Sequence, residues 1–514
     1  MAVDFNTIKL LWPEITLVAM ATAIYLGSAF RRGATMWTAI AVASFVVAGV
    51  PLVDQIWKGN LEPSGPLTVD FLAVAFRSLA IFLGILFTLA AGRSTDDDQA
   101  GEVLGSLMLI IVGLMLVVTS GELVLMFVGL ELISIPTYVL LFLGRRDRAS
   151  AESTVKYFFL GILSSALLLY GFSFLYGLAG SMQLNEIAAV LRAAGESGFS
   201  HGLLASVAFV LILAGLGFKI AAVPFHFYAP DVYQGTTHIN AGLLAVIPKI
   251  AGVVALVRLV PLLTPSISEF AWHLLVVLAI LTMTLGNICA LWQKNLRRLM
   301  AYSSIAHAGY LLIGIAAGLA VPESGGISAA LFYLLVYSLA TLGAFAAFAF
   351  LRRGGREVER VDDLAGLIRV RPGMAGVIAV FMFSLTGIPP LAGIWGKFTL
   401  LRSAVDIASG TGAANLKTWF LILAIAGAVN AAIAAAYYLR VIAVMFFRSA
   451  QSELAVGRAA GAGVTAALCA IFVTLVGILP GQWMRYAQLA DRPRLDAVES
   501  TPRNSAARSE LSSE

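Results

Sequence analysis

Long runs of apolar residues, separated by short polar stretches, dominate the pattern of this chain. Most runs hold about 20 apolar residues, the length that an α-helix needs to cross the hydrocarbon core of a bilayer. The pattern predicts fourteen spanning helices, near residues 9–30, 34–57, 68–91, 102–119, 121–143, 153–177, 201–224, 237–260, 271–291, 296–318, 326–351, 373–401, 417–447 and 459–480. The shorter, amphipathic segment 183–195 is predicted to lie at the membrane interface. We therefore expect an all-α integral membrane protein.

Composition supports this class. Hydrophobic residues make up 60% of the 514 residues, charged residues 12%, and the mean hydropathy is +0.90. A soluble domain carries about 25% charged residues. The net charge of +5 comes from arginines and lysines in the polar loops. Membrane topology explains such a distribution, so we expect a lipid bilayer and no nucleic acid among the partners.

Basic residues gather in the loops on one side of the membrane. This is the side that the chain reaches at the end of the first span, and it is called side A. Side A carries Arg31, Arg32, Arg93, Arg145, Arg146, Arg148, Lys294, Arg297, Arg298, Arg352, Arg353, Arg356, Arg360, Arg369, Arg371, Arg448 and Arg458. The inter-helix loops of the opposite side, side B, carry Lys58, Arg192, Arg258, Arg402 and Lys417. Seventeen basic residues against five predict that side A is cytoplasmic. Both termini then lie on the outer side, and the composition of the tail 485–514 is typical of disorder.

Prolines interrupt two of the predicted spans. One interruption covers residues 220–231 in the seventh span, and the other covers residues 385–393 in the twelfth. Proline removes a backbone donor, and in a membrane the freed carbonyls must be satisfied by protein or water. Paired interrupted helices in corresponding halves of a transporter point to its ion site. Because the breaks lie five helices apart, helices 4–8 and 9–13 are predicted to form two repeats, the second inverted relative to the first.

These repeats predict a division of the chain. We expect three N-terminal helices in 1–100, a first five-helix repeat in 101–262, a second in 263–450, helix 14 in 451–484 and the disordered tail in 485–514.

Ionisable residues in the middle of apolar spans are the main indication of function. Glu131, Lys219, Lys249 and Lys397 each lie between apolar turns. Each charge at the centre of a spanning helix costs about 2.5–3.5 kcal/mol on insertion scales. Lysine suits a proton relay because burial brings the pKa of an amine toward neutral pH, whereas arginine stays charged. The pattern predicts a line of proton-carrying groups.

Several further residues are candidates for the same relay, and most of them have a structural alternative. Lys156 follows Glu152 by four residues, so the two are equally explained as an ion pair on one helix face. His307 lies within the tenth span, where it could instead bond a neighbouring helix. His226 and His238 flank a break and a helix start, and Asp231 could act only as a helix cap.

Other kinds of site are absent from the sequence. It has no glycine-rich dinucleotide fingerprint, and Gly396-Lys397 is followed by Phe398 rather than Ser or Thr, so it is not a phosphate loop. The two cysteines, Cys289 and Cys469, lie far apart in apolar runs and cannot hold an iron–sulfur cluster alone. We expect no metal and no cofactor bound by this chain, so the driving chemistry must occur elsewhere.

Four stretches resemble a known family: GLELISIP (129–136), PFHFYAPDVYQG (224–235), NLRRLMAYSSIAHAGY (295–310) and GIPPLAGIWGKF (387–398). The chain resembles the antiporter-like subunits of proton-pumping NADH:quinone oxidoreductase (respiratory complex I), subunit N in particular, and the related multisubunit cation/proton antiporters. The resemblance extends from the third to the fourteenth helix. Two departures from the family pattern, Thr236-Thr237-His238 and Pro248 before Lys249, lie at and near the start of the eighth helix.

The resemblance implies a function and its residues. Glu131, Lys219, Lys249 and Lys397 match the glutamate of the fifth helix and the lysines of the seventh, eighth and twelfth helices. The implied role is a non-redox translocase subunit in a bacterial inner membrane. Other membrane subunits would be its partners and would bind the NADH and quinone, and redox chemistry there would drive proton transport through the relay. A cation/proton antiporter subunit without redox partners is the alternative, and an inert membrane scaffold leaves the central lysines unexplained.

Overall fold

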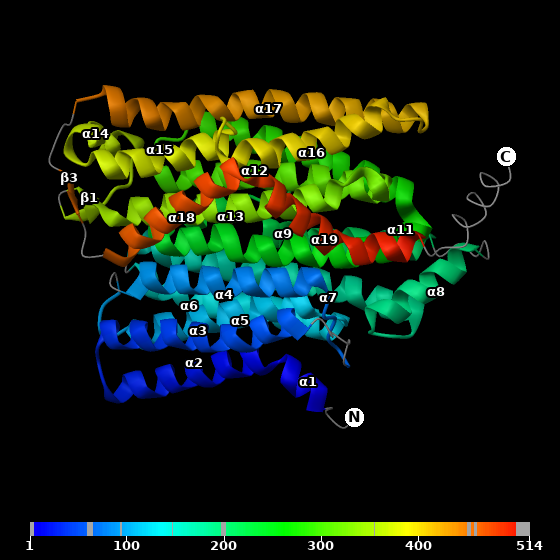
Figure 1. The fold of residues 1–514 in the computed structure, drawn as a ribbon, viewed down its shortest axis with the longest axis horizontal. Helices are drawn as coiled ribbons and strands as arrows, with labels where there is room; N and C mark the ends of the chain where they lie inside the picture. Colours follow the sequence, from blue (N-terminus) through cyan, green and yellow to red (C-terminus); the bar gives the residue numbers. More distant parts are fainter. Residues whose placement is uncertain are drawn as a thin grey trace.

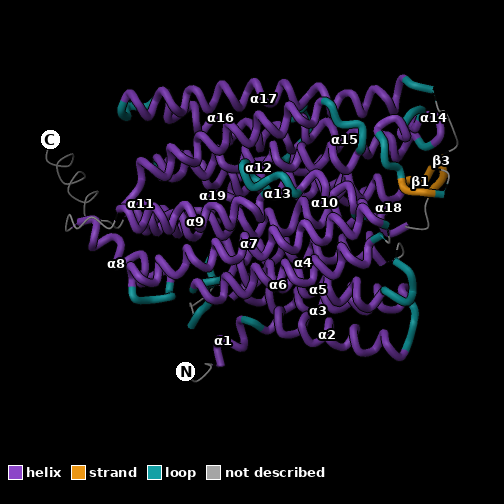
Figure 2. The backbone as a smooth tube through the Cα atoms, turned by 180° about the vertical axis from the view of Figure 1, so that it is seen from behind, coloured by secondary structure: helices purple, strands orange, loops and turns teal. Residues whose placement is uncertain are grey.

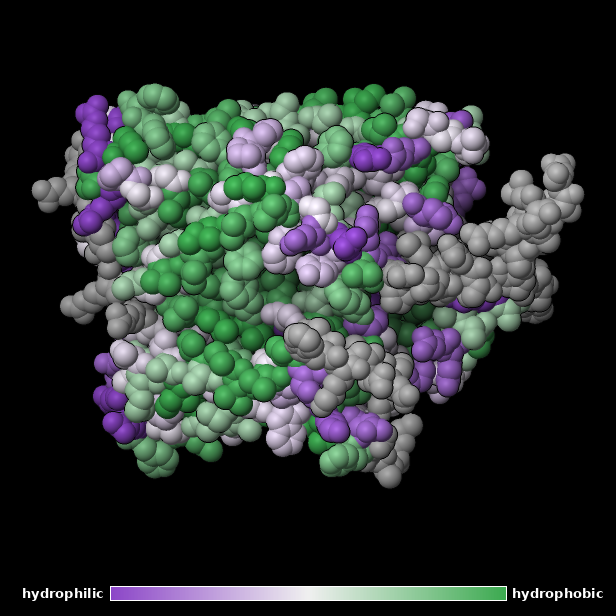
Figure 3. Space-filling model, in the orientation of Figure 1, coloured by the Kyte–Doolittle hydropathy of each residue, from purple (hydrophilic) through white to green (hydrophobic). Residues whose placement is uncertain are grey.

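The computed structural model describes residues 5–58, 65–92, 95–145, 147–196, 202–353, 355–449, 454–456 and 460–499. These residues form a bundle of long helices that run nearly parallel to one another across the molecule (Figures 1 and 2). Apolar side chains cover most of the face in Figure 3, and hydrophilic residues lie at the two ends of the helices and in a patch right of the centre. The surface is therefore that of a membrane protein, as predicted.

Thirteen spans among the described residues are long and apolar enough to cross a membrane. They are α2 (Trp12–Phe30), α3 (Ala34–Lys58), α4 (Phe71–Gly92), α5 (Ala100–Thr119), α6 (Leu123–Gly144), α7 (Arg148–Ala179), α9 (Gly202–Ile220), the two parts of α11 (His238–Leu291), α12 (Leu296–Ala320), α13 (Gly326–Phe350), α17 (Ala414–Phe447) and α18 (Ala460–Ile478). The predicted twelfth span is the shorter pair α15 (Pro372–Thr386) and α16 (Ala392–Ser409). The remaining helices are α1 (Phe5–Leu10), α8 (Leu184–Glu196), α10 (Ala229–Gly235), α14 (Leu367–Val370), α19 (Pro480–Glu499) and the 3₁₀ turns η1 (Pro322–Ser324) and η2 (Val361–Leu364).

Both predicted helix breaks are present. α9 ends at Ile220, and α10 begins only at Ala229. α15 ends at Thr386, where Gly387 adopts a φ of 93° that favours glycine, and α16 begins at Ala392. Each break leaves backbone groups without helical partners in the interior of the bundle. The inverted relation of the two five-helix repeats stays a prediction.

The eighth and ninth predicted spans form one continuous element, α11, which changes direction at Ile267 (φ −143°, ψ 23°). Its first part runs as a helix through Pro248, and the Thr237 side chain caps it by accepting a hydrogen bond from the Asn240 N–H. The two departures from the family pattern are thus accommodated within a regular helix. Lys249 is carried on its buried face.

A small sheet lies at the side A end of the bundle, with strand order β2-β1-β3. β1 (Leu351–Arg353) pairs antiparallel with both β2 (Arg356–Glu357) and β3 (Leu454–Val456). Figure 1 places β1 and β3 at the end opposite α8. β1 and β2 follow α13, whereas β3 lies between α17 and α18, so the sheet joins two distant loops, a detail that hydropathy alone does not indicate.

The structure differs from the predicted disordered tail, because residues 485–499 continue as helix α19. Ala487 and Ala490 are buried, and the ring of Tyr486 stacks on that of Phe71 with centroids 6.1 Å apart. Apolar residues at helical spacing therefore hold α19 against the bundle despite its many charged neighbours. Residues 500–514 lie outside the described part of the chain.

Candidate functional site

Glu131 and Lys219 face each other across α6 and α9. The Lys219 Nζ lies 3.8 Å from a Glu131 carboxylate oxygen and donates a 2.6 Å hydrogen bond to the Ser134 hydroxyl. The Ser165 hydroxyl of α7 donates to the same carboxylate. Glu131 lies eight residues after Leu123, about 12 Å along its helix, which places the pair well inside the bilayer. Three helices thus converge on one charge pair, in which Lys219 is buried and Glu131 is half-buried.

Lys219 is the second-last residue of α9, directly before the break. Its aliphatic stem packs on Gly252 of α11, where a Cβ would lie 3.4 Å from the Lys219 Cβ and only 2.6 Å from Ile220. Any larger residue at Gly252 would push α9 and α11 apart. Lys249 lies on the same helix, one turn before Gly252, so the first two lysines occupy neighbouring turns of adjacent helices.

Lys249 is bonded only to uncharged groups among the described residues. Its Nζ donates to the backbone carbonyl of Ser304 and, at 2.7 Å, to the hydroxyl of the same residue. The Nζ also lies 4.7 Å from the ring centroid of Tyr337, an arrangement that stabilises a cation through the aromatic face. The Tyr337 hydroxyl donates to Ser304 Oγ at 2.8 Å and so closes the cluster.

His307 lies beyond this cluster, surrounded by tyrosines. Its Nδ1 and Nε2 are bonded to the hydroxyls of Tyr333 (2.5 Å) and Tyr438 (2.9 Å), while Tyr438 also bonds Ser303. The His307 ring centroid is 5.0 Å from that of Tyr337. His307 therefore bonds two neighbouring helices, α13 and α17, as its structural alternative expects. The phenol and imidazole groups that make these bonds can each give and accept a proton.

Lys397 is the last of the buried ionisable residues and lies in the second half of the bundle. Its Nζ donates to the carbonyls of Leu385 (2.8 Å) and Thr386 (2.9 Å), which the break after α15 leaves without helical partners. The Nζ lies 5.0 Å from the ring centroid of Tyr310, whose ring is 6.2 Å from that of His307. Lysine, aromatic rings and histidine therefore connect Lys249 to Lys397 through buried residues.

Lys156 occupies a different environment from the other lysines. Its side chain is 39% exposed and pairs with Glu152 at 2.6 Å and with Asp231 at 2.9 Å. Arg298 of α12 pairs with the other oxygen of Asp231 at 2.6 Å. Asp231 is therefore a bridge between the two halves of the bundle rather than a simple cap. The expected pair of Lys156 with Glu152 is present, within a larger surface network.

The other two candidate histidines, His226 and His238, lie in different parts of the bundle. His226 is half-buried in the break between α9 and α10, and its Nδ1 is buried without a hydrogen-bond partner among the described residues. His238, the first residue of α11, is buried, and its Nε2 lies 2.6 Å from the carbonyl of Val358. His238 therefore lies at the side A end of the bundle, where it contacts Val358 rather than the buried lysines.

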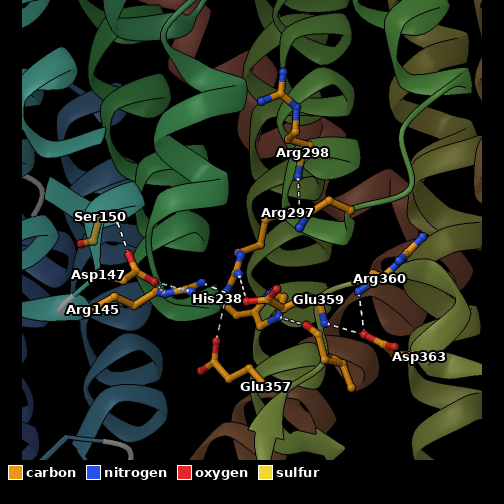
Figure 4. A network of polar contacts seen from close by, with 12 residues as sticks. Arg145, Asp147, Ser150, His238, Arg297, Arg298, Glu357, Glu359, Arg360 and Asp363 are labelled. Atoms are coloured by element: carbon orange, nitrogen blue, oxygen red, sulfur yellow. Dashed lines mark hydrogen bonds and ion pairs between the residues drawn. The ribbon is translucent and has the colours of Figure 1, made fainter. Parts of the chain in front are cut away.

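The side A end is closed by a network of arginines and carboxylates (Figure 4). Glu359 pairs with Arg145 at 3.0 Å and with the buried Arg297 at 2.8 Å, so it joins the loop before α7 to the start of α12. Burial raises the pKa of the Glu359 carboxyl, but the two guanidinium groups outweigh this and hold the pKa below its usual value. The Ser150 N–H, aided by Arg145, lowers the pKa of Asp147, which caps α7.

Sequence reasoning missed the buried tyrosines and one ion pair. Tyr333 and Tyr337 are four residues apart on α13, a spacing that places them on one helix face and offered a usable signal. Arg77 and Glu14 form a buried pair of 2.7 Å between α4 and α2. Arg77 also donates to the side chain of Gln55. Both charges lie toward one end of their spans, where a single residue gives no sign that it points inward.

Comparison with known proteins places this geometry in a family. Residues 120–423 match the family described as NADH:quinone oxidoreductase/Mrp antiporter, TM. NADH-quinone oxidoreductase subunit N 1 of Rhizobium meliloti (strain 1021) is 38% identical over 457 residues, which cover 87% of this chain and 90% of the relative. Subunit N of Trichlorobacter lovleyi is 36% identical and covers 95% of this chain and 98% of the relative.

Two solved structures share the fold of this chain. A chain of respiratory complex I from Thermus thermophilus superimposes with a TM-score of 0.75 and 30% identity, covering 92% of this chain and 98% of that chain. A chain of the Mrp complex from Dietzia sp. shares the fold at a TM-score of 0.75 with 19% identity, covering 93% and 97%. Since the family match spans more than half of the chain and the relatives match over nearly their whole length, this chain belongs to the NADH:quinone oxidoreductase/Mrp antiporter transmembrane family, together with the subunit N proteins.

Proposed function

We propose that this chain is a proton-translocating membrane subunit of an NADH:quinone oxidoreductase. The observation that carries the proposal is the connected set of buried groups from the Glu131–Lys219 pair, through Lys249 and His307, to Lys397. Four charges in the interior of spanning helices cost about 10 kcal/mol together on insertion scales, so a role in handling mobile charge accounts for them. The family membership supports the same role.

In this proposal, each residue has a separate task. Protons enter from side A, the cytoplasmic side, and are taken up around Lys219 and Lys249. Glu131 sets how firmly Lys219 holds its proton and couples it to a neighbouring subunit. His307 and its tyrosines carry protons to Lys397, from which they leave at side B. Lys156 and His226 lie toward side A and assist uptake.

The driving reaction takes place elsewhere in the complex. The chain acts as a non-redox subunit of the translocase, and its partners are other membrane subunits that handle NADH and quinone. The arginine-rich side A faces the cytoplasm of a bacterium, which leaves both termini on the outer side of the inner membrane. Each proton moved against 100 mV requires about 2.3 kcal/mol, which falls within the range that changes in buried charge pairs can supply.

The test uses the assembled complex in inverted membrane vesicles, with Lys219→Ala, Lys397→Ala and Lys397→Arg. Protons pumped per NADH oxidised should fall strongly in all three, since arginine keeps its charge and cannot pass a proton on. Lys417→Ala, which removes a lysine at a helix end, is the control and should pump normally. Unchanged pumping per electron in both alanine variants would refute the proposal. Sodium-dependent flux without NADH oxidation would favour the antiporter function instead.

A further inference from the structure

An apolar groove opens on the face of the bundle drawn in Figure 3, between α4, α13 and α18 and beneath α19. The groove has a volume of about 470 Å³ and is lined by apolar and aromatic residues, among them Phe71, Phe82, Leu331, Leu339 and Phe472. The hydroxyl of Ser78, which also lines it, donates to the carbonyl of Val74. The groove therefore provides an apolar surface for a hydrocarbon chain, and the Ser78 hydroxyl already has a hydrogen-bond partner in Val74.

The length of the groove corresponds to one leaflet of a bilayer. On α4 it extends from Phe71, the first residue of the helix, to Phe82, and eleven residues of helix measure about 16 Å. The hydrocarbon core is about 30 Å thick, so one leaflet measures about 15 Å. The groove thus begins at the side B end of the spans and stops near the middle of the membrane.

Helix α19 covers the groove and restricts what can enter it. The ring of Trp483 lies 5.8 Å from that of Phe472 and 6.1 Å from that of Tyr486, which in turn stacks on Phe71. These aromatic contacts bridge from α18 over α19 to α4. A helix with its side chains is about 10–12 Å across, so a spanning helix of a partner subunit does not fit beneath this bridge. A single hydrocarbon chain does.

A polar pocket of about 280 Å³ adjoins the side B end of the groove, and Phe332 lines both. This headgroup pocket is lined by Glu323 and Ser328 near the start of α13, by Arg402 and Asp406 near the end of α16, and by Gln488 of α19. Arg402 and Asp406 lie 3.4 Å apart and are largely exposed. One cation and two carboxylates around hydroxyl and amide groups complement a ligand that carries both a phosphate and an ammonium group.

We propose that the groove and the headgroup pocket together bind one phospholipid of the side B leaflet, with a zwitterionic amine-bearing headgroup. The phosphate lies at Arg402 and Ser328, the ammonium at Glu323 and Asp406, and an acyl chain fills the groove beneath α19. This lipid ties α19 to α4 and α13 and is independent of the proton relay.

The test measures the phospholipid retained by the full chain purified in its complex with mild detergent. After delipidation, the complex is incubated with phosphatidylethanolamine or phosphatidylglycerol of identical acyl chains, and bound lipid is quantified by mass spectrometry. Phosphatidylethanolamine should be retained at about one molecule per chain. Arg402→Gln should weaken retention about fivefold, as expected for one basic residue at a membrane surface.

Leu335→Trp fills the groove and should abolish retention, whereas Leu281→Trp, at an exposed apolar position on α11, should leave it unchanged. Thermal unfolding of each variant without lipid separates a loss of binding from a loss of folding. Equal retention of both lipids, retention by Leu335→Trp equal to that of the unmodified chain, or an isoprenoid quinone found in place of phospholipid would each overturn the proposal. Crosslinking of a photoreactive residue at Leu335 to another subunit would do the same.

Discussion

Lys219 pairs with Glu131, with 3.8 Å between its Nζ and the carboxylate. In the described part of the chain it is the only one of the three central lysines that pairs with a carboxylate. At this distance and an effective dielectric of about 20, their attraction amounts to about 4 kcal/mol. Ser134 and Ser165 hold the two partners in place. The proton affinity of one therefore depends on the position of the other, which is the property that a switch in a proton relay requires.

Removing the carboxylate should uncouple this switch. Glu131→Gln keeps the size and one hydrogen-bond acceptor for Ser165 but removes the charge. We expect proton pumping per NADH oxidised to fall several-fold while the complex still assembles, because the attraction of about 4 kcal/mol is lost. Glu186→Gln on α8 is the control, since Glu186 is exposed and accepts a hydrogen bond from Ser181. Normal pumping by Glu131→Gln would rule out a role for the pair.

The tyrosines around His307 permit a comparison of two adjacent phenols on α17. The Tyr438 hydroxyl contacts His307, whereas the Tyr437 hydroxyl donates to Asn287. Tyr438→Phe should slow pumping about threefold to tenfold, corresponding to one lost hydrogen bond in the relay. Tyr437→Phe should affect thermal stability and leave pumping per electron unchanged. Equal pumping rates in the two variants would show that the histidine contact has no part in transport.

The break before α16 depends on a close approach of two backbones. A Cβ at Gly393 would lie 1.7 Å from the carbonyl oxygen of Ser384, a distance that no packing adjustment of side chains can relieve. Gly393→Ala should therefore destabilise the protein by about 1–3 kcal/mol, as overpacking does elsewhere. Gly376→Ala on α15 meets no atom within 4 Å and should be neutral or slightly stabilising. Thermal unfolding of the two purified variants measures the difference.

The side A network should make stability depend on pH. The pKa of Glu359 is lowered in the folded protein, so its contribution is complete above the unfolded value of about 4.3 and is lost as the pH falls through the folded value. Because Glu359 is 45% exposed, the contribution should stay below about 1 kcal/mol. Unfolding temperatures of the unmodified chain and Glu359→Gln should differ at pH 7 and converge below about pH 4.

Glu269→Gln, at an exposed site on α11, provides the control for this titration and should follow the unmodified chain throughout. A gap between the unmodified chain and Glu359→Gln that stays constant down to pH 3.5 would contradict the assignment of the effect to Glu359.

The spans and their two breaks could be predicted because strong physical penalties determine them. A bilayer requires about 20 apolar residues per helix, and Pro224, Pro389 and Pro390 lie in the two breaks, where each lacks the backbone N–H that a helix interior needs. The central lysines were found for the same reason, since a buried amine is costly enough to be conspicuous.

The tyrosines and α19 could not be predicted on those grounds. The spacing of Tyr333 and Tyr337 places both on one helix face, but only the packing of α12, α13 and α17 shows that this face and Tyr438 surround His307. Residues 485–499 carry too many charges to suggest burial, and only the contacts of Tyr486, Ala487 and Ala490 hold them as a helix. The inverted relation of the repeats is still a prediction.

The break before α16 gives Lys397 neutral partners: two carbonyls and a tyrosine ring. A proton that reaches this amine therefore adds a full uncompensated charge to the second half of the bundle, whereas a proton on Lys219 completes a neutral pair with Glu131. Proton transfer from Lys219 to Lys397 thus leaves Glu131 as an unpaired negative charge and makes Lys397 positive. A short dipole is replaced by two widely separated charges, whose electric field extends much farther through hydrocarbon. In the proposed relay, occupancy of Lys397 would therefore change the electric field at an adjoining subunit without any movement of the helices between them.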